Sequence, residues 1–126
     1  MGILEAAKPA IVICTRDRDR ATAFYRDALG LTLAYEDNLA SVFNTGGVTL
    51  RVSVVPDFTP HAHTILGFNV PDVHATVKAL RENGVAFNLY PRFHQDELGI
   101  STIPGGTVQV AWFMDPDGNV LSVTNA

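Results

Sequence analysis

The sequence of 126 residues has few cysteines, no long apolar run and few basic residues, and each shortage excludes a class of protein. It contains one cysteine, Cys14, which excludes an intrachain disulfide framework and favours a reducing compartment. No apolar run approaches the length of a membrane span, and the N-terminus lacks the basic segment, apolar core and cleavage site of a signal peptide. We therefore expect a cytoplasmic protein with no membrane partner.

Basic charge is also scarce. Nine Lys and Arg residues against thirteen Asp and Glu residues give a net charge of −4, and no block of like charge occurs. Because nucleic acids attract clustered positive charge, we expect no nucleic-acid partner. Apolar residues are plentiful by contrast. Hydrophobic residues make up 47% of the chain, which is enough for the core of one domain.

Two segments of the sequence repeat the same order of features. Asp17 precedes apolar residues at helical spacing, and Gly30 follows where a helix would end. Asp72 and Gly84 bound a second such segment. The aspartates are 55 residues apart (17 to 72) and the glycines 54 apart (30 to 84), so the pattern predicts an internal duplication.

Each expected helix is flanked by strand-like runs and followed by a hairpin with a glycine in its turn. The repeated unit is therefore β-α-β-β-β. We predict one domain over 1–126, made of a module at about 8–56 and a module at about 61–126. The segment 91–106 has no clear period; it is either a loop that borders a binding site or an ordered connection with no ligand.

Two motifs, "FYRDALGL" and "DPDGNVLSV", together with the paired modules resemble the vicinal oxygen chelate superfamily, which includes glyoxalases, bleomycin-resistance proteins and extradiol dioxygenases. The resemblance extends from about residue 9 to residue 123. It implies an α+β fold in which two βαβββ modules form an open, curved mixed β-barrel with the helices outside and a cavity inside. It also implies a small-molecule ligand and a homodimer.

The resemblance further implies a divalent metal held by His or Gln and by acidic residues at fixed positions of the strands. In this sequence those positions fall on Ala10, Ile65, Ser122 and a residue near Leu50. None of the four is a strong metal ligand. We therefore predict that the usual metal is absent and that the protein has no cofactor.

A displaced metal site is the alternative. Zn, Ni, Mn or Fe would be bound by nonstandard ligands and would support a lyase, isomerase or dioxygenase. The candidate ligands for it are His61, His63, His94, Asp96 and Glu97. The sequence leaves open whether the protein is an enzyme. Asp115 and Asp117, in contrast, are typical of a turn, and Asp17 and Asp72 are typical helix caps.

Aromatic and basic residues predict the lining of a cavity that holds a hydrophobic or planar molecule. The predicted ligand-binding residues are Phe43, Arg51, Tyr90, Arg92, Phe93, Trp112 and Ser122. Trp112 and Phe113 are adjacent in a strand, so one ring must face the cavity and the other the helices. For Phe43 a place in the core is the alternative, and Arg51 could instead point outward from an edge strand.

Overall fold

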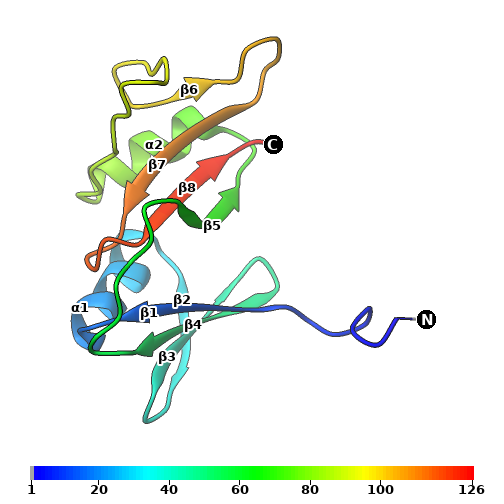
Figure 1. The fold of residues 1–126 in the computed structure, drawn as a ribbon, viewed down its shortest axis with the longest axis vertical. Coiled ribbons are helices and arrows are strands. Elements are labelled where there is room, and N and C mark those ends of the chain that lie inside the picture. Colours follow the sequence, from blue (N-terminus) through cyan, green and yellow to red (C-terminus); the bar gives the residue numbers. More distant parts are fainter. Residues whose placement is uncertain (1) are drawn as a thin grey trace.

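A computed structural model describes residues 2–126, which form two four-stranded mixed sheets and two helical segments (Figure 1). In spatial order the first sheet contains β1 (Ala10–Thr15), β4 (Val48–Val54), β3 (Ala40–Thr45) and β2 (Thr32–Glu36). The second contains β5 (Thr64–Asn69), β8 (Val120–Thr124), β7 (Gln109–Met114) and β6 (Ser101–Thr102). The helical segments are α1 (Arg18–Ala23), which continues directly into η1 (Phe24–Ala28), and α2 (Val73–Glu82).

The two sheets repeat one topology. In each, the first strand of the module pairs in parallel with the last strand, and the remaining pairs are antiparallel. The sheets are not closed into one barrel. The predicted α+β fold of two βαβββ modules in an open, curved arrangement is therefore confirmed.

The helices begin and end where the sequence predicts. The Asp17 carboxylate accepts a hydrogen bond from the backbone N–H of Arg20 at 3.2 Å, and Asp72 accepts one from that of Ala75 at 3.0 Å. Gly30 and Gly84 have φ angles of 76° and 91°, a conformation that residues with a Cβ rarely adopt. The π-helical turn η1 after α1 was not predicted, because its residues carry no distinct pattern.

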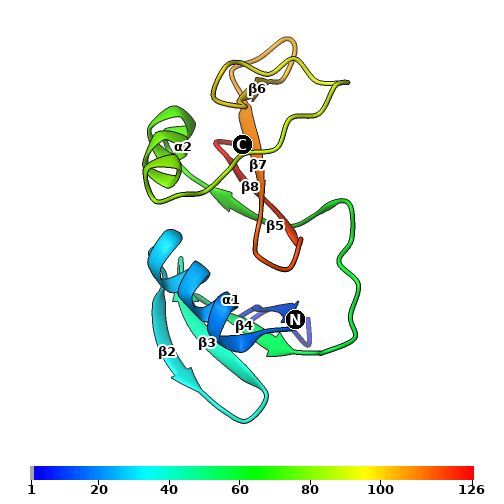
Figure 2. The same ribbon diagram turned by 90° about the vertical axis from the view of Figure 1, so that its left-hand side faces the viewer.

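One face of each sheet packs against the helices, and the other face is open. In β4, Leu50 and Val52 are buried on the helix side, and Arg51 between them points the opposite way. The buried residues of both modules join in a single apolar cluster. Figure 2 shows α2 above α1 on the same side of the molecule. The open faces carry exposed apolar side chains such as Val12, which is 60% exposed.

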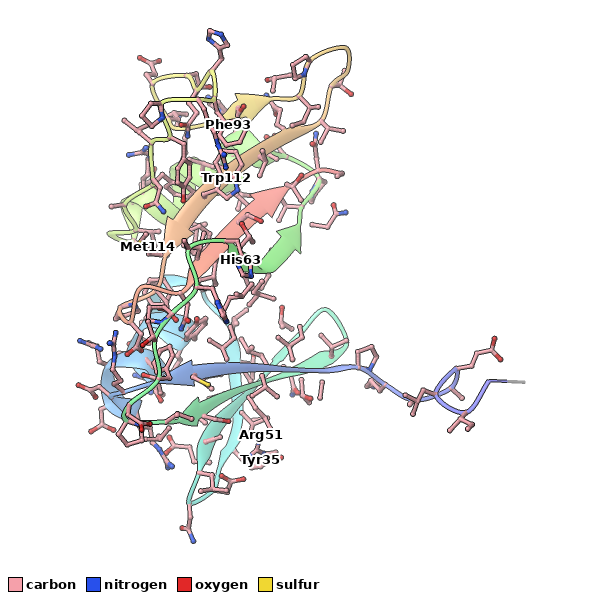
Figure 3. The ribbon with its side chains drawn as sticks, viewed as in Figure 1. Tyr35, Arg51, His63, Phe93, Trp112 and Met114 are labelled. Atoms are coloured by element: carbon pink, nitrogen blue, oxygen red, sulfur yellow. The ribbon has the colours of Figure 1, made fainter. Side chains whose placement is uncertain are left out.

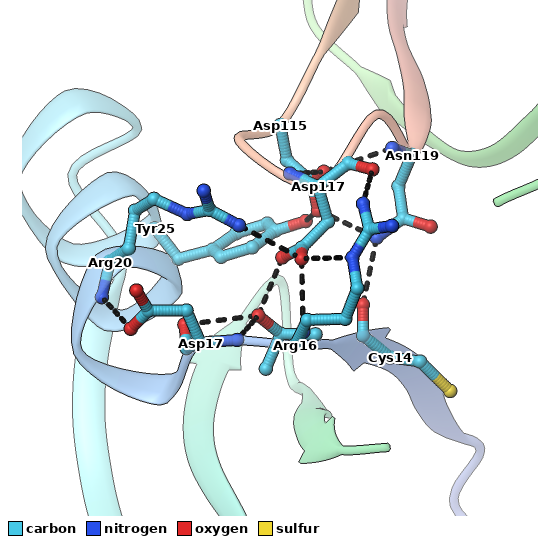
Figure 4. A network of polar contacts seen from close by, with 9 residues as sticks. Cys14, Arg16, Asp17, Arg20, Tyr25, Asp115, Asp117 and Asn119 are labelled. Carbon is cyan, nitrogen blue, oxygen red and sulfur yellow. Dashed lines mark hydrogen bonds and ion pairs between the residues drawn. The ribbon is translucent and has the colours of Figure 1, made fainter. Parts of the chain in front are cut away.

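The turn between β7 and β8 ties the second module to the first (Figure 4). The Asp117 carboxylate accepts hydrogen bonds from the Thr15 hydroxyl at 2.5 Å and from the Arg16 backbone N–H at 2.9 Å. It also accepts one from the Arg20 guanidinium at 3.1 Å. Burial acts to raise the pKa of Asp117, but these hydrogen bonds and the charge of Arg20 together hold it below its usual value.

A second carboxylate of this turn has partners in both modules. Asp115 accepts a hydrogen bond from the Tyr25 hydroxyl at 2.6 Å and one from the Asn119 side chain at 2.8 Å. Asn119 also donates to the backbone carbonyl of Cys14 at 2.9 Å. Burial, with the nearby charge of Asp115, raises the pKa of Tyr25 well above its usual range. The two aspartates thus have structural partners, as their turn sequence predicts, and the link between modules is an addition to that prediction.

Candidate ligand-binding site

The site is built around Trp112 on the open face of the second sheet. Its neighbours in β7, Ala111 and Phe113, are both fully buried on the helix side, so the indole points the other way. The predicted alternation of Trp112 and Phe113 is confirmed. Trp112 lies opposite Ser122 in β8, and Ser122 lies opposite Gly67 in β5. A Cβ at Gly67 would stand 3.0 Å from the Ser122 hydroxyl oxygen, so glycine gives this serine its space.

Two further rings from the loop after α2, those of Phe93 and Tyr90, contact the indole, and Figure 3 shows Phe93 next to Trp112. Phe93 stacks on Trp112 with ring centroids 5.0 Å apart and planes 25° apart. Tyr90 meets Trp112 edge to face at 5.3 Å. The Arg92 guanidinium lies over the Phe93 ring at 5.1 Å from its centroid. The structure thus brings together four of the predicted ligand-binding residues, and these contacts lie within the range of favourable aromatic and cation–π geometry.

Gln95 fastens the loop that carries these rings. Its side-chain oxygen accepts a hydrogen bond from the Tyr90 N–H at 2.6 Å. Its amide nitrogen donates to the carbonyls of Asn88 at 2.9 Å and Gly99 at 2.8 Å. Both stems of the loop are therefore held by one side chain. No sequence pattern indicates this role, because a single glutamine in an aperiodic segment looks like any exposed polar residue.

A hollow opens beside the three rings, with a volume of about 170 Å³. The residues that line it are Ala62, His63, Thr64, Tyr90, Arg92, Phe93, Trp112 and Val120. A cavity of about 150 Å³ holds one benzene molecule, so this hollow has room for about one six-membered ring. Its walls combine aromatic and aliphatic side chains with the polar side chains of His63, Thr64 and Arg92.

Arg51 lies on the open face of the first sheet. It belongs to a row across the four strands in which Val12, Arg51, Val42 and Tyr35 are successive partners. Its guanidinium pairs with the Asp37 carboxylate at 3.0 Å. Hydrogen bonds from the backbone N–H of Leu39 and from Arg51 lower the pKa of Asp37. Figure 3 shows Arg51 and Tyr35 in one module and Trp112 in the other, so one chain does not bring Arg51 to the aromatic hollow.

Phe43 lies away from both open faces. It is fully buried on the helix side of β3, where its ring centroid is 6.0 Å from that of Tyr25. Its strand partner Leu50 is buried on the same side. Because the sheet separates Phe43 from the open face, its ring belongs to the core, which was the alternative left open from the sequence.

The positions that hold a metal in related proteins offer no donor set here. Ala10 is exposed at the start of β1. Ile65 lines a larger hollow of about 310 Å³ between residues 58–61 and β1, together with Cys14 and His61. Ser122 is buried in β8 as the strand partner of Trp112. An alanine and an isoleucine have no atom that binds a divalent ion, so these residues do not fit the usual metal.

The histidines do not assemble a displaced site within one chain. His61 and His63 stack on each other with centroids 4.9 Å apart. His63 lines the aromatic hollow, whereas His61 lines the larger one. Among residues 2–126, no group of three or more His, Cys, Asp or Glu side chains is arranged to bind a metal ion. His94, Asp96 and Glu97 thus do not join the histidine pair to form such a group.

Two βαβββ modules with open sheet faces define a paired-module α+β protein, and its second module carries an aromatic hollow. A family model described as "Glyoxalase/Bleomycin resistance protein/Dioxygenase superfamily" matches residues 9–123, and the chain belongs to this superfamily. The predicted family is confirmed. A comparison with curated proteins gives no match. No helix within residues 2–126 is long and apolar enough to cross a membrane.

Solved structures share the fold at low sequence identity. A bleomycin resistance determinant encoded on transposon Tn5 is 22% identical, with a TM-score of 0.71 over 94% of this chain and 97% of that chain. A superfamily member from Sphaerobacter thermophilus is 22% identical, with a TM-score of 0.75 over 97% and 98%. A putative glyoxalase family protein from Bacillus anthracis is 16% identical, with a TM-score of 0.75 over 98% of both chains. These similarities establish the fold alone.

Proposed function

We propose that the protein binds a planar, hydrophobic small molecule against Trp112 and sequesters or carries it without a divalent metal. The observation that carries this proposal is the group of three rings, Tyr90, Phe93 and Trp112, around an open hollow. Flat rings at the surface of a rigid sheet bind planar molecules by stacking and by burial of apolar area.

Two side chains supply polar anchors for such a ligand. Arg92 and His63 both line the hollow, next to Trp112. A guanidinium forms paired hydrogen bonds with a carboxylate, sulfonate or carbonyl group of a ligand. The ligand class is therefore a planar apolar body with an anionic or carbonyl substituent. This is a binding proposal, and no catalytic residue is assigned.

The same proposal includes a homodimer in the cytoplasm. Each chain has two open sheet faces, one with Arg51 and Tyr35 and the other with Trp112. Val12, Tyr35 and Met114 on these faces are 60%, 54% and 47% exposed. A second copy that lays its first sheet over the aromatic hollow of its partner would cover this apolar area and complete a cavity with Arg51.

Calorimetric titration of the full chain with anthraquinone-2-sulfonate, a planar anion of three fused rings, tests the proposal. We expect saturable binding, and we expect Trp112→Leu to weaken it by roughly tenfold or more because a stacked, buried ring is lost. Leu89→Ala is the matched control, since Leu89 is an exposed apolar residue of the same loop. Equal affinities for the wild type and Trp112→Leu would contradict the proposal.

A further inference from the structure

Phe93 occupies the place that a stacked ligand needs. Its ring lies on the indole of Trp112 with a centroid separation of 5.0 Å and an angle of 25°. Two rings in direct contact at this separation leave no space for a third ring between them. Tyr90 approaches the same indole edge-on rather than by a face. A planar ligand that stacks on the covered face of Trp112 must therefore displace Phe93.

The hydrogen bonds of the loop allow Phe93 to move off Trp112 while the stems of the loop stay in place. Residues 91–94 form the exposed tip of this loop, and Phe93 itself is 39% exposed. Directly after the tip, Gln95 holds the stems through its hydrogen bonds to Tyr90, Asn88 and Gly99. One backbone hydrogen bond, from the Phe93 N–H to the Tyr90 carbonyl at 3.0 Å, stabilises the tip itself. A rearrangement confined to the tip leaves the three Gln95 bonds intact.

The volume of the hollow makes this displacement depend on ligand size. With about 170 Å³, the hollow admits about one ring while Phe93 stays in place. We propose that Phe93 is the specificity-determining residue for ligand size: it competes with fused polycyclic ligands for the face of Trp112, whereas for one-ring ligands it forms part of the wall of the hollow. This inference rests on the proposed binding function, because it concerns the same site.

Arg92 extends the inference to the charge of the ligand. Its guanidinium carbon lies over the Phe93 ring, 5.1 Å from the ring centroid, and Trp112 stacks on the same ring. A ligand ring that replaces Phe93 therefore takes a position next to a cation. Anionic polycyclic aromatic molecules are the class that gains most from both contacts.

The test compares two sulfonates that differ in ring number, anthraquinone-2-sulfonate and benzenesulfonate, on the full-length wild type and Phe93→Ala. Removing the competing ring should tighten anthraquinone-2-sulfonate by about threefold to tenfold, the equivalent of one aromatic stack. Benzenesulfonate should not bind more tightly to Phe93→Ala, and should bind up to about threefold more weakly, because Phe93 forms part of the wall of the hollow that this one-ring ligand occupies. Leu89→Ala again serves as the control on the same loop, and thermal denaturation verifies that each variant is folded.

The outcomes separate this inference from the proposal on which it rests. If Phe93→Ala weakens the binding of anthraquinone-2-sulfonate or leaves it unchanged, while Trp112→Leu still weakens it as expected, Phe93 is an ordinary wall of the site and the inference is overturned alone. If neither probe binds the wild type or Phe93→Ala, the binding function and the inference are both overturned.

Discussion

The two modules share a topology but differ in what their open faces carry. The first presents a row of aliphatic, basic and phenolic side chains, with Arg51 held by Asp37. The second presents Trp112 with Phe93 stacked on it and Tyr90 edge-on to it. The difference begins in one connection. In the first module, η1 ends at Ala28 and β2 begins at Thr32, whereas in the second, α2 ends at Glu82 and β6 begins only at Ser101.

This comparison teaches where a duplicated fold acquires a site. The long connection in the second module replaces most of a strand, since β6 has two residues where β2 has five. The connection contains Tyr90, Arg92 and Phe93, which line the hollow on the open face. The scaffold is kept and the loop is changed, which is the usual way in which one fold hosts different ligands.

The largest effect is expected from breaking the connection between the two modules. Asp117→Ala removes the acceptor for Thr15, Arg16 and Arg20 and leaves the buried Thr15 hydroxyl with one partner fewer. We expect a loss of about 3 kcal/mol in the free energy of unfolding, because charge-assisted hydrogen bonds to a buried carboxylate are lost. Denaturation with urea measures it.

An exposed aspartate provides the control for that variant. Asp27 forms an ion pair with its neighbour Arg26 at the surface, so Asp27→Ala should leave the urea midpoint unchanged. If both variants have the midpoint of the wild type, the turn does not stabilise the arrangement of the modules.

Tyr25→Phe tests the other carboxylate of the same turn and should have a smaller effect. It removes the hydroxyl that donates to Asp115 at 2.6 Å but keeps the buried ring. Because Asp115 retains hydrogen bonds from Asn119 and from backbone N–H groups, we expect a loss of about 1.5 kcal/mol in unfolding free energy. A loss as large as that of Asp117→Ala would show that the two carboxylates act as one inseparable unit.

The free energy of unfolding at acidic pH tests the role of Asp117. The pKa of Asp117 is lower in the folded protein than its ordinary value of 3.8. The ionised carboxylate therefore adds to the free energy of unfolding at pH values above 3.8. The contribution is lost as the pH falls through the lower, folded pKa. Between pH 5 and pH 2, roughly, the wild type should therefore lose more stability than Asp117→Asn, which cannot titrate. Parallel curves for the two proteins in urea denaturation would contradict this assignment.

The smallest effect is expected from the open face of the first module. Arg51→Leu should weaken anthraquinone-2-sulfonate by about twofold to fivefold if a partner chain brings this face over the hollow, because an exposed ion pair contributes modestly. The neutral 2-(hydroxymethyl)anthraquinone should bind equally to both proteins. Calorimetry with both probes measures the difference, and equal losses for the two would show that the charge of Arg51 does not contact the ligand.

Local patterns in the sequence were sufficient to predict the helices and the βαβββ order of each module. Asp17 and Gly30 fix the ends of a helix through their own backbone preferences, and strand alternation assigns Trp112 and Phe113 to opposite faces. The side of the sheet on which Phe43 lies depends on strand register, which a one-residue shift would reverse. Local preference alone therefore could not place that ring.

Long-range contacts were beyond the reach of sequence patterns. Asp117 meets Arg16 across 101 positions of the chain, and an Asp-Pro-Asp-Gly turn looks the same whether or not it docks on a helix. The anchoring by Gln95 likewise depends on how the loop folds back on itself. No local sequence pattern indicates that Arg51 and Trp112 lie on the open faces of two different sheets.

The fluorescence of Trp112 during titration with anthraquinone-2-sulfonate tests the central claim most directly, because Trp112 is the single tryptophan of the chain. Quinones in contact with an indole quench its emission, so the emission reports contact at this one ring. The account predicts saturable quenching that follows the binding curve obtained by calorimetry. Calorimetric binding with the emission of Trp112 unchanged would place the ligand elsewhere and contradict the claim that the second module carries the site.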